Sequence, residues 1–411
     1  MDILVLNAGS STLKFGLFRT TENKSDGNSS PVVIEGALVR GIVERIGSDR
    51  AQIRFLQPGD RKPIPVRAAS AIKAAEAVLE LASSGRLTTE ADSKVHAVGC
   101  RVVHGGANLT ELVRVTATVL NQIRELATLA PLHNPIDADV IEAALAMALD
   151  APVVAVFDTA FHHTIPVVAS TYALPWELSQ AHALRRYGFH GISHRYVSER
   201  LLDLLGRGTH VTRVITCHLG SGCSVCAIRD GRSIDTSMGL TPLEGLVMGS
   251  RSGDIDPGLL LYLLRTVGIT IDALEDILNH RSGLAGLSGR GGDVRDLEQA
   301  VQAGDARAEL ALEVFAYRVC KYIGAYAAAL GGLDAVAFTG GIGEHSSGMR
   351  SRICQPLEFL GLSLHDDRNR AALGDKPMSI GKDVGAVRVW VIPTDEELQI
   401  AREVNALLRP K

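Results

Sequence analysis

Two arginines stand in segments that could bind anionic groups. Arg101 lies inside the apolar run 95–106 (VHAVGCRVVHGG), where an unpaired guanidinium would be costly to bury. Either a structural carboxylate or an anionic substrate would satisfy it. Arg251 lies in the small-residue loop 248–254 (MGSRSGD), which can present a guanidinium without covering it. Because guanidinium groups make paired hydrogen bonds, the two arginines could bind a carboxylate and a transferring phosphoryl group.

Two histidines and one aspartate occupy further candidate positions. His133 lies in the loop PLHNP, and His190 lies in the loop RRYGFHG. A loop histidine more often has a surface or packing role, so residue type alone assigns neither of them a function. Asp158 follows the apolar run 153–157, and open α/β sheets bind ligands at the carboxyl ends of their strands.

Two Gly/Ser turns could hold phosphate. The turn 7–12 (NAGSST), followed by Lys14, and the turn 218–222 (HLGSG) each place backbone N–H groups and hydroxyls after a strand. Such N–H groups can form an anion-binding concavity, and an ordinary hairpin turn has the same composition. The glycines of 340–343 could let an adenosine lie against bare backbone, or they could form a tight turn between a strand and a helix. No P-loop and no complete GxGxxG motif occurs, so phosphate would be bound between hairpins.

Strand-like and helix-like segments alternate along the chain, which predicts an α/β fold. The opening strand–turn–strand pattern recurs at 214–225, and this recurrence suggests a duplicated domain. The predicted strands are 3–7, 13–18, 32–39, 52–56, 95–103, 153–157, 211–218, 224–228, 233–236, 335–339 and 387–392. The predicted helices are 68–81, 137–148, 306–330 and a closing helix near Asp395 with Thr394 as its N-cap. The polar stretch 20–30 predicts a mobile loop.

Length and composition exclude several classes of protein. A chain of 411 residues exceeds what one core usually supports, so two domains are expected. The net charge is -4 and no basic block occurs, which argues against nucleic-acid binding. The apolar stretches 143–157 and 323–338 are interrupted by Asp150 and Asp334, which argues against a membrane helix.

Two further features concern the cellular compartment. No basic region or small-residue cleavage site precedes the first strand, so we expect a cytoplasmic protein. The 6 cysteines are scattered, and we expect them to be reduced packing residues.

Taken together, these motifs resemble the acetate kinase family, within the superfamily of acetate and sugar kinases, Hsp70 and actin. The resemblance runs nearly end to end and rests on residues 6–15, 101–106, 130–135, 156–162, 186–191, 235–239, 241–246, 251–257, 340–344 and 392–398. It implies an α/β fold of duplicated ribonuclease-H-like domains, as in actin-like ATPases, flanking an interdomain cleft. Residues 1–160 plus 395–411 would form the N-terminal domain, and residues 161–394 the C-terminal nucleotide-binding and dimerisation domain of a homodimer.

The resemblance also implies the reaction and its residues. The reaction is reversible in-line transfer of the γ-phosphoryl group of ATP to acetate, giving acetyl phosphate and ADP, with Mg²⁺ as cofactor and Mn²⁺ as a substitute. The implied catalytic residues are Asp158, His190 and Arg251. The implied substrate-binding residues are Arg101, Val103, Leu132, His133, Phe189 and Pro242. The implied nucleotide-binding residues are Lys14, His218, Leu219, Gly220, Ser221, Gly222, Asp293, Val294, Arg295, Gly341, Ile342, Gly343, Glu344 and His345. Asn7 and Glu396 are the implied metal-binding residues.

Several positions depart from the family pattern. Cys100 replaces a common His, Ile192 a Thr, and Ser221, His345 and Asp395 each replace an Asn. The residues expected to be catalytic are unchanged, so we expect the protein to be active. The substitutions at Ser221 and His345 leave open which nucleotide it prefers.

The ionisation state of a carboxylic acid limits what Asp158 could do in the reaction. A carboxylic acid is ionised at pH 7 and needs no general base, so we expect Asp158 to orient an arginine or a magnesium-bound water.

Two rival functions stay open. A propionate kinase is one rival, because one methylene in an apolar pocket is worth only about 1–3 kcal/mol. An ATP-gated binding module of the actin or Hsp70 type is the other, and Arg101, His190 and Arg251 argue against it. The interpretation depends on Arg101 and Arg251 converging on one anion pocket.

Overall fold

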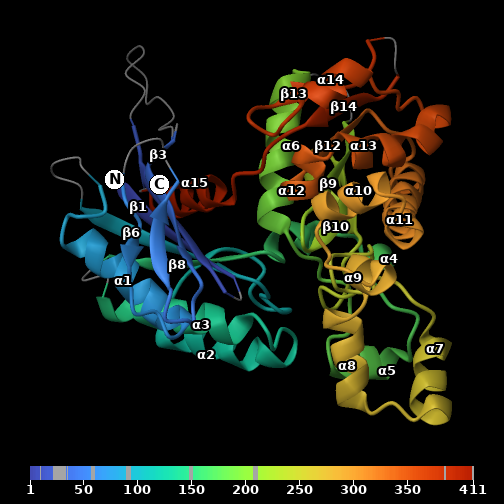
Figure 1. The fold of residues 1–411 in the computed structure, drawn as a ribbon. Coiled ribbons are helices and arrows are strands. Elements are labelled where there is room, and N and C mark those ends of the chain that lie inside the picture. The colour runs from blue at the N-terminus through green and yellow to red at the C-terminus, as the bar shows by residue number, and fades with distance from the viewer. Residues whose placement is uncertain are drawn as a thin grey trace. The chain divides into compact units, whose positions relative to one another are not determined.

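The computed structural model describes residues 1–9, 11–21, 34, 36–56, 61–88, 94–147, 151–206, 212–383 and 386–409. The chain divides into two compact units (Figure 1). The first unit comprises Met1–Ala160 and Asp395–Lys411, and the second comprises Phe161–Thr394. Each unit has one mixed sheet with helices packed on it, so the predicted α/β class is confirmed.

The first unit has an eight-stranded sheet in the order β5-β4-β3-β2-β1-β6-β8-β7. Its strands are β1 (Asp2–Ala8), β2 (Leu13–Arg19), β3 (Ala37–Glu44), β4 (Gln52–Phe55), β5 (Ile64–Pro65), β6 (Val95–Val102), β7 (Val113–Arg114) and β8 (Val153–Phe157). Its α-helices are α1 (Ala71–Ser83), α2 (Ala117–Glu125), α3 (Asn134–Met147) and α15 (Glu396–Leu408).

Strand β6 shows why the central strands are apolar on both sides. Val98 and Cys100 belong to the core cluster that contains the buried residues of α1 and α3. Gly99 lies between them and faces α15, because a Cβ on Gly99 would lie 2.8 Å from Ile400 and 2.9 Å from Val404. Only glycine permits α15 to approach the strand this closely. The sheet is therefore covered on both faces, and the C-terminal helix completes the first unit.

The second unit has a six-stranded sheet in the order β11-β10-β9-β12-β14-β13. Its strands are β9 (Arg213–Leu219), β10 (Cys223–Arg229), β11 (Arg232–Thr236), β12 (Ala335–Thr339), β13 (Met378–Ser379) and β14 (Arg388–Val391). Its α-helices are α4 (Val167–Ser170), α5 (Trp176–Ala181), α6 (Gly191–Leu205), α7 (Pro257–Tyr262), α8 (Ile271–His280), α9 (Gly283–Ser288), α10 (Val294–Gln302), α11 (Ala306–Leu330), α12 (Gly340–His345), α13 (Ser347–Cys354) and α14 (Asp366–Ala371). Helices α6 and α11 lie on opposite sides of this sheet (Figure 1).

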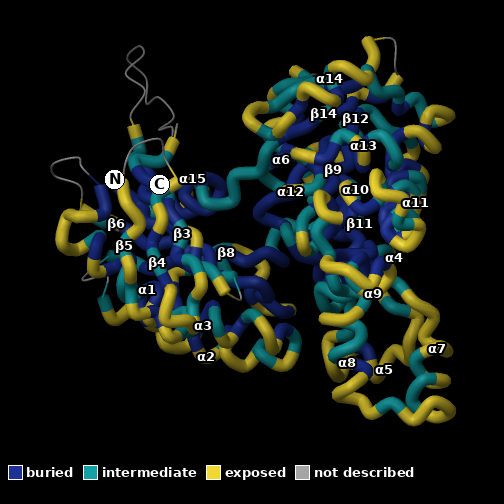
Figure 2. Tube along the Cα trace, viewed as in Figure 1, coloured by how far each residue is buried: buried dark blue, intermediate teal, exposed yellow. Residues whose placement is uncertain are grey.

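The two sheets share one central topology, which confirms the expected duplication. In the first unit β1 pairs antiparallel with β2 and parallel with β6, and β6 pairs parallel with β8. In the second unit β9 pairs antiparallel with β10 and parallel with β12, and β12 pairs parallel with β14. Figure 2 shows that buried residues concentrate in the strands, whereas most residues of α7 and half of those of α8 are exposed.

One local prediction lies partly outside the described residues, and another was wrong. The third predicted strand, 32–39, overlaps β3, which spans Ala37–Glu44 and pairs with β2 and β4, and residues 32, 33 and 35 lie outside the described residues. The N-cap of the closing helix is Asp395 rather than Thr394, since the Asp395 side chain accepts a hydrogen bond from Leu398 N at 3.0 Å. Most of the predicted loop 20–30 lies outside the described residues.

The remaining expectations about the chain concern its cysteines and membranes. All 6 cysteines are free thiols, and all except the half-buried Cys320 are buried. Among the helices that the structure describes, none has the length and apolar character needed to cross a bilayer.

Candidate active site

The residues expected at the site are divided between the two units. The first unit contains Asn7, Lys14, Arg101, Val103, Leu132, His133, Asp158 and Glu396, and the second contains all the others. The convergence of Arg101 with Arg251 therefore stays a prediction.

Arg101 binds Asp158 within the first unit. Arg101 Nη2 and Nε lie 2.6 and 3.1 Å from Asp158 Oδ2, and Nη1 donates to the carbonyl oxygen of Ala8 at 3.2 Å. The two parallel strands β6 and β8 bring the pair together, because Asp158 follows β8 and its backbone N–H donates to Val102 O. Burial lowers the pKa of Arg101, but Asp158 and other nearby carboxylates overcome this effect and raise it above its usual value. A structural carboxylate therefore satisfies this arginine, and its remaining N–H groups could bind a substrate.

Asp137 and Asn134 are buried side chains at this site that the sequence interpretation missed. Both lie in the first turn of α3, directly after Leu132 and His133. Asp137 Oδ2 accepts from Val103 N at 2.8 Å, and Asn134 exchanges hydrogen bonds with both backbone groups of His104. Burial raises the pKa of Asp137 to about 7, although Arg101 and the Val103 N–H act to lower it. The signal in the sequence was an Asn and an Asp three residues apart at a helix start.

The N-terminus of α15 carries carboxylates to the end of β1. Asn7 Nδ2 donates to Glu396 Oε2 at 3.1 Å and to Glu397 Oε1 at 2.8 Å. The pKa of Glu397 is raised above its usual value, mainly by burial. The charge of Lys14 acts to lower this pKa, and the charge of Glu396 acts to raise it. Asp395, one of the departures from the family pattern, caps the helix and also binds both Nη atoms of Arg40.

These carboxylates fit a divalent cation. Mg²⁺ prefers oxygen ligands and is commonly held by one or two carboxylates together with substrate phosphates. Glu396 and Glu397 supply such oxygens, and their mutual repulsion favours an added cation. Within the described ranges, no group of three or more His, Cys, Asp or Glu side chains is placed so that it could hold a metal ion.

The turn between β9 and β10 brings His190 and Arg251 to one place in the second unit. The turn is closed by Gly220 N donating to Gly222 O at 3.1 Å. A Cβ on Gly222 would lie 3.3 Å from His190 Nε2 and 3.7 Å from Arg251 Nη1. Two predicted catalytic side chains therefore face the predicted phosphate turn. Burial lowers the pKa of Arg251.

His190 is held in an unusual backbone conformation. Its φ is 56°, in the left-handed region, at the N-cap of α6. Non-glycine residues seldom occupy this region, and such strain is often found at functional sites. The His190 ring stacks on the His218 ring at 4.3 Å, and His190 Nδ1 lies 2.9 Å from Ser224 Oγ.

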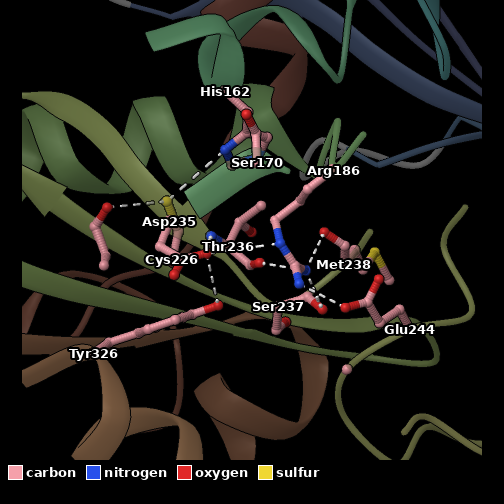
Figure 3. A network of polar contacts seen from close by, with 12 residues as sticks. His162, Ser170, Arg186, Cys226, Asp235, Thr236, Ser237, Met238, Glu244 and Tyr326 are labelled. Carbon is pink, nitrogen blue, oxygen red and sulfur yellow. Dashed lines mark hydrogen bonds and ion pairs between the residues drawn. The ribbon is translucent and has the colours of Figure 1, made fainter. Parts of the chain in front are cut away.

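Arg186 fixes the loop that carries Pro242 and Arg251. Its Nη1 donates to the carbonyl oxygens of Thr236, Ser237 and Met238, and its Nη2 lies 2.6 Å from Glu244 Oε1 (Figure 3). Arg186 also lies four residues before His190. It therefore ties the segment of one predicted catalytic residue to the loop of the other, a role that its type alone did not indicate.

The segment after β12 lies beside the same turn. Thr339 pairs with His218, and a Cβ on Gly340 would lie 2.7 Å from Leu219 O. The predicted residues 341–345 follow in α12, where Glu344 Oε1 accepts from Thr339, Gly340 and Thr394.

Arg350 binds backbone carbonyl groups of α12. It is fully buried, and its five N–H groups donate to Gly343 O, Glu344 O, Asn369 Oδ1, Asn369 O and Ala372 O. All donors are thus satisfied by neutral acceptors.

The predicted segment 293–295 begins α10 near the turn. Asp293 caps the helix and binds Arg295 Nη2 at 2.6 Å, while Val294 is buried. Gly292 packs against Gly249, whose N–H donates to Ser221 O at 3.1 Å. The structure therefore joins segments 218–222, 248–251 and 292–295 within one unit.

The side chains expected to enclose the methyl group of the substrate are divided between the two units. Val103 is buried and Leu132 is 48% exposed in the first unit, whereas Phe189 is buried and Pro242 half-buried in the second. Their assembly into one pocket stays a prediction.

Known proteins resemble this chain along its whole length. It is 45% identical over 411 residues to acetate kinase of Treponema denticola, covering 100% of both chains, and 45% identical to acetate kinase of Chloroherpeton thalassium, covering 98% of each. The crystal structure of Porphyromonas gingivalis acetate kinase matches with a TM-score of 0.87 at 38% identity, covering 99% of this chain and 100% of that one. A propionate kinase from Francisella tularensis matches with a TM-score of 0.86 at 38% identity and 98% coverage of each. The model of the acetokinase family matches residues 2–402, and the chain belongs to this family.

Proposed function

We propose that this protein is an acetate kinase that transfers the γ-phosphoryl group of ATP reversibly to acetate, forming acetyl phosphate and ADP. The observation that carries the proposal is the placement of His190 Nε2 and Arg251 Nη1 beside Gly222. A histidine, a guanidinium and a glycine turn are what an anionic phosphoryl group would need in order to be held and stabilised.

The acceptor carboxylate binds Arg101 in this proposal. Asp158 occupies one edge of the guanidinium, so the edge that remains would receive the substrate. Acetate is ionised near pH 7 and can attack without losing a proton, so Asp158 positions Arg101 rather than acting as a base. His190 and Arg251 would meet the charge that spreads over the transferring oxygens, and the proposed transfer is direct and in line.

Mg²⁺ would be held by Asn7, Glu396 and Glu397, with Mn²⁺ as a substitute. Bound there, the metal would neutralise phosphate charge. Lys14 is paired with Asn7 across β1 and β2, which supports a role at the nucleotide phosphates. Segments 218–222, 293–295 and 341–345 would line the nucleotide.

The test is ATP-dependent acyl phosphate formation, trapped as the hydroxamate, with formate, acetate, propionate and butyrate. We expect the highest kcat/KM with acetate. Absence of acyl phosphate with every acid would reject the proposal and favour an ATP-gated binding module. A higher kcat/KM for propionate would instead identify a propionate kinase, the alternative that the Francisella tularensis structure favours.

A homodimer built on the second unit is part of the proposal. Exposed apolar side chains occur on α4, α5, α8 and α11, including Val167, Val168, Trp176, Ile271 and Tyr317 at 72%, 89%, 61%, 74% and 66% exposure. Surfaces of this kind commonly form subunit interfaces. Sedimentation of the wild type and of Ile271→Asp tests it, since a dimer should dissociate in the variant.

A further inference from the structure

Four polar side chains form a continuous hydrogen-bonded chain behind the predicted catalytic histidine. Thr216 Oγ1 lies 2.7 Å from His194 Nδ1, and His194 Nε2 lies 2.8 Å from Ser224 Oγ. Ser224 Oγ also lies 2.9 Å from His190 Nδ1. Thr216, His194 and Ser224 are fully buried, so their hydrogens must be shared within the chain.

Counting hydrogens leaves two consistent arrangements. Burial lowers the pKa of His194 well below its usual value, so its ring is neutral and carries one N–H. In the outward order, Thr216 donates to His194 Nδ1, His194 Nε2–H donates to Ser224, and Ser224 donates to His190 Nδ1. His190 then carries its hydrogen on Nε2. In the inward order every donor is reversed, beginning with His190 Nδ1–H.

The hydroxyl of Thr216 distinguishes the two orders. In the inward order Thr216 accepts from His194, and its own hydrogen has no acceptor, because Thr216 makes no other side-chain hydrogen bond within the described ranges. A buried donor without a partner is costly. The outward order satisfies the hydrogens of Thr216, His194 and Ser224, which are the three fully buried groups, and it is therefore favoured.

We propose that Ser224 is a positioning residue that fixes His190 as the Nε2–H tautomer, with that hydrogen directed at the turn of Gly222. Nε2 is the atom that would face an anionic phosphoryl oxygen, since a Cβ on Gly222 would lie 3.3 Å from it. A bare Nε2 would present a lone pair to that oxygen and repel it. The role in transfer rests on the proposed function, whereas the tautomer does not.

Nitrogen-15 NMR of the full-length, histidine-labelled protein tests the tautomer directly. The 13 histidines require one assignment variant, His190→Gln, whose missing signals identify the ring. We expect Nδ1 of His190 to have the shift of a bare nitrogen and Nε2 that of a protonated one. The opposite tautomer in the wild type would overturn the proposal, whether or not the Ser224 variants fold.

Variants test the effect on catalysis. Ser224→Ala should lower kcat by about 10–100-fold, the usual cost of removing a group that orients a catalytic side chain, with smaller changes in KM. Ser224→Thr retains the hydroxyl and should recover most of kcat. The matched control is Ser233→Ala, which removes a buried serine 2.9 Å from a different histidine, His162. Its kcat should stay within about twofold of wild type.

Two outcomes separate this inference from the proposed function. If the wild type forms no acyl phosphate but shows the Nε2–H tautomer, only the proposed function fails. If Ser224→Ala keeps both the tautomer and a kcat equal to that of Ser233→Ala, the role of Ser224 is rejected and the function stands.

Discussion

Arg101 Nη2 lies 2.6 Å from Asp158 Oδ2, and the two side chains are 16% and 1% exposed. Removing one partner of a buried ion pair costs about 3–5 kcal/mol, because the other charge is left unpaired. Asp158 is thus bound to the arginine that we expect to hold the acceptor, and its influence on the reaction should pass through that arginine.

Asp158→Asn should lower kcat/KM for acetate by about 100-fold while leaving the shape of its pH profile unchanged. An amide binds the guanidinium more weakly than a carboxylate does, but no proton transfer is lost. Steady-state kinetics from pH 6 to 9 check this. Loss of the acidic limb of the profile in the variant alone would show that Asp158 acts as a base.

Arg251→Ala should lower kcat by roughly two to four orders of magnitude, because it removes a cation that stabilises the transferring phosphoryl group. Arg370→Ala is the control, since Arg370 is 66% exposed and pairs with Asp367 on the surface. Turnover of Arg251→Ala within tenfold of that control would contradict the role.

Asp137 should make the folded protein less stable as the pH rises from about 4 to about 7. Its pKa is raised to about 7 by burial, against a usual value of 3.8, so the folded state holds a proton that the unfolded state has lost. The loss of stability is absent below the lower value and complete above the higher one. Asp137→Asn keeps an acceptor for Val103 N and removes this loss.

Urea unfolding of wild type and Asp137→Asn at pH 5 and pH 8 measures the effect. The variant should gain stability over the wild type on going to pH 8. Glu142→Gln, which removes an exposed carboxylate from the same helix, should show no such gain. Equal pH dependence in all three proteins would contradict the prediction.

Arg350→Lys should lower the thermal midpoint and raise KM for ATP, with little change in KM for acetate. Lysine has three donors instead of five, so at least two of the buried acceptors lose their partner, at about 1–3 kcal/mol each. The carbonyls of Gly343 and Glu344 belong to the predicted nucleotide segment, which is why ATP should be affected. Arg352→Lys, on the same helix but 33% exposed and paired with Glu309, is the control.

The long periodic elements could be predicted from the sequence. The 306–330 helix and the 335–339 strand have the predicted bounds, because helical periodicity and short apolar runs are properties of neighbouring residues. The short helices in the middle of the chain were harder to predict. Helices α5, α7 and α9 have 6 residues each, which is too short for a periodic signal, and contacts with the rest of the unit stabilise them.

By itself the sequence determined the α/β class, the duplicated hairpin and the types of residue that could bind an anion. Only the tertiary structure decided how those residues are paired. Arg101 could have bound a substrate or a carboxylate, and the register of β6 against β8 supplied Asp158, 57 residues away. The chain from Thr216 to His190 likewise joins two strands and a helix. Hydrophobic periodicity depends on residues that are neighbours along the chain, whereas the hydrogen-bond and ion-pair partners of a side chain depend on how distant segments pack together.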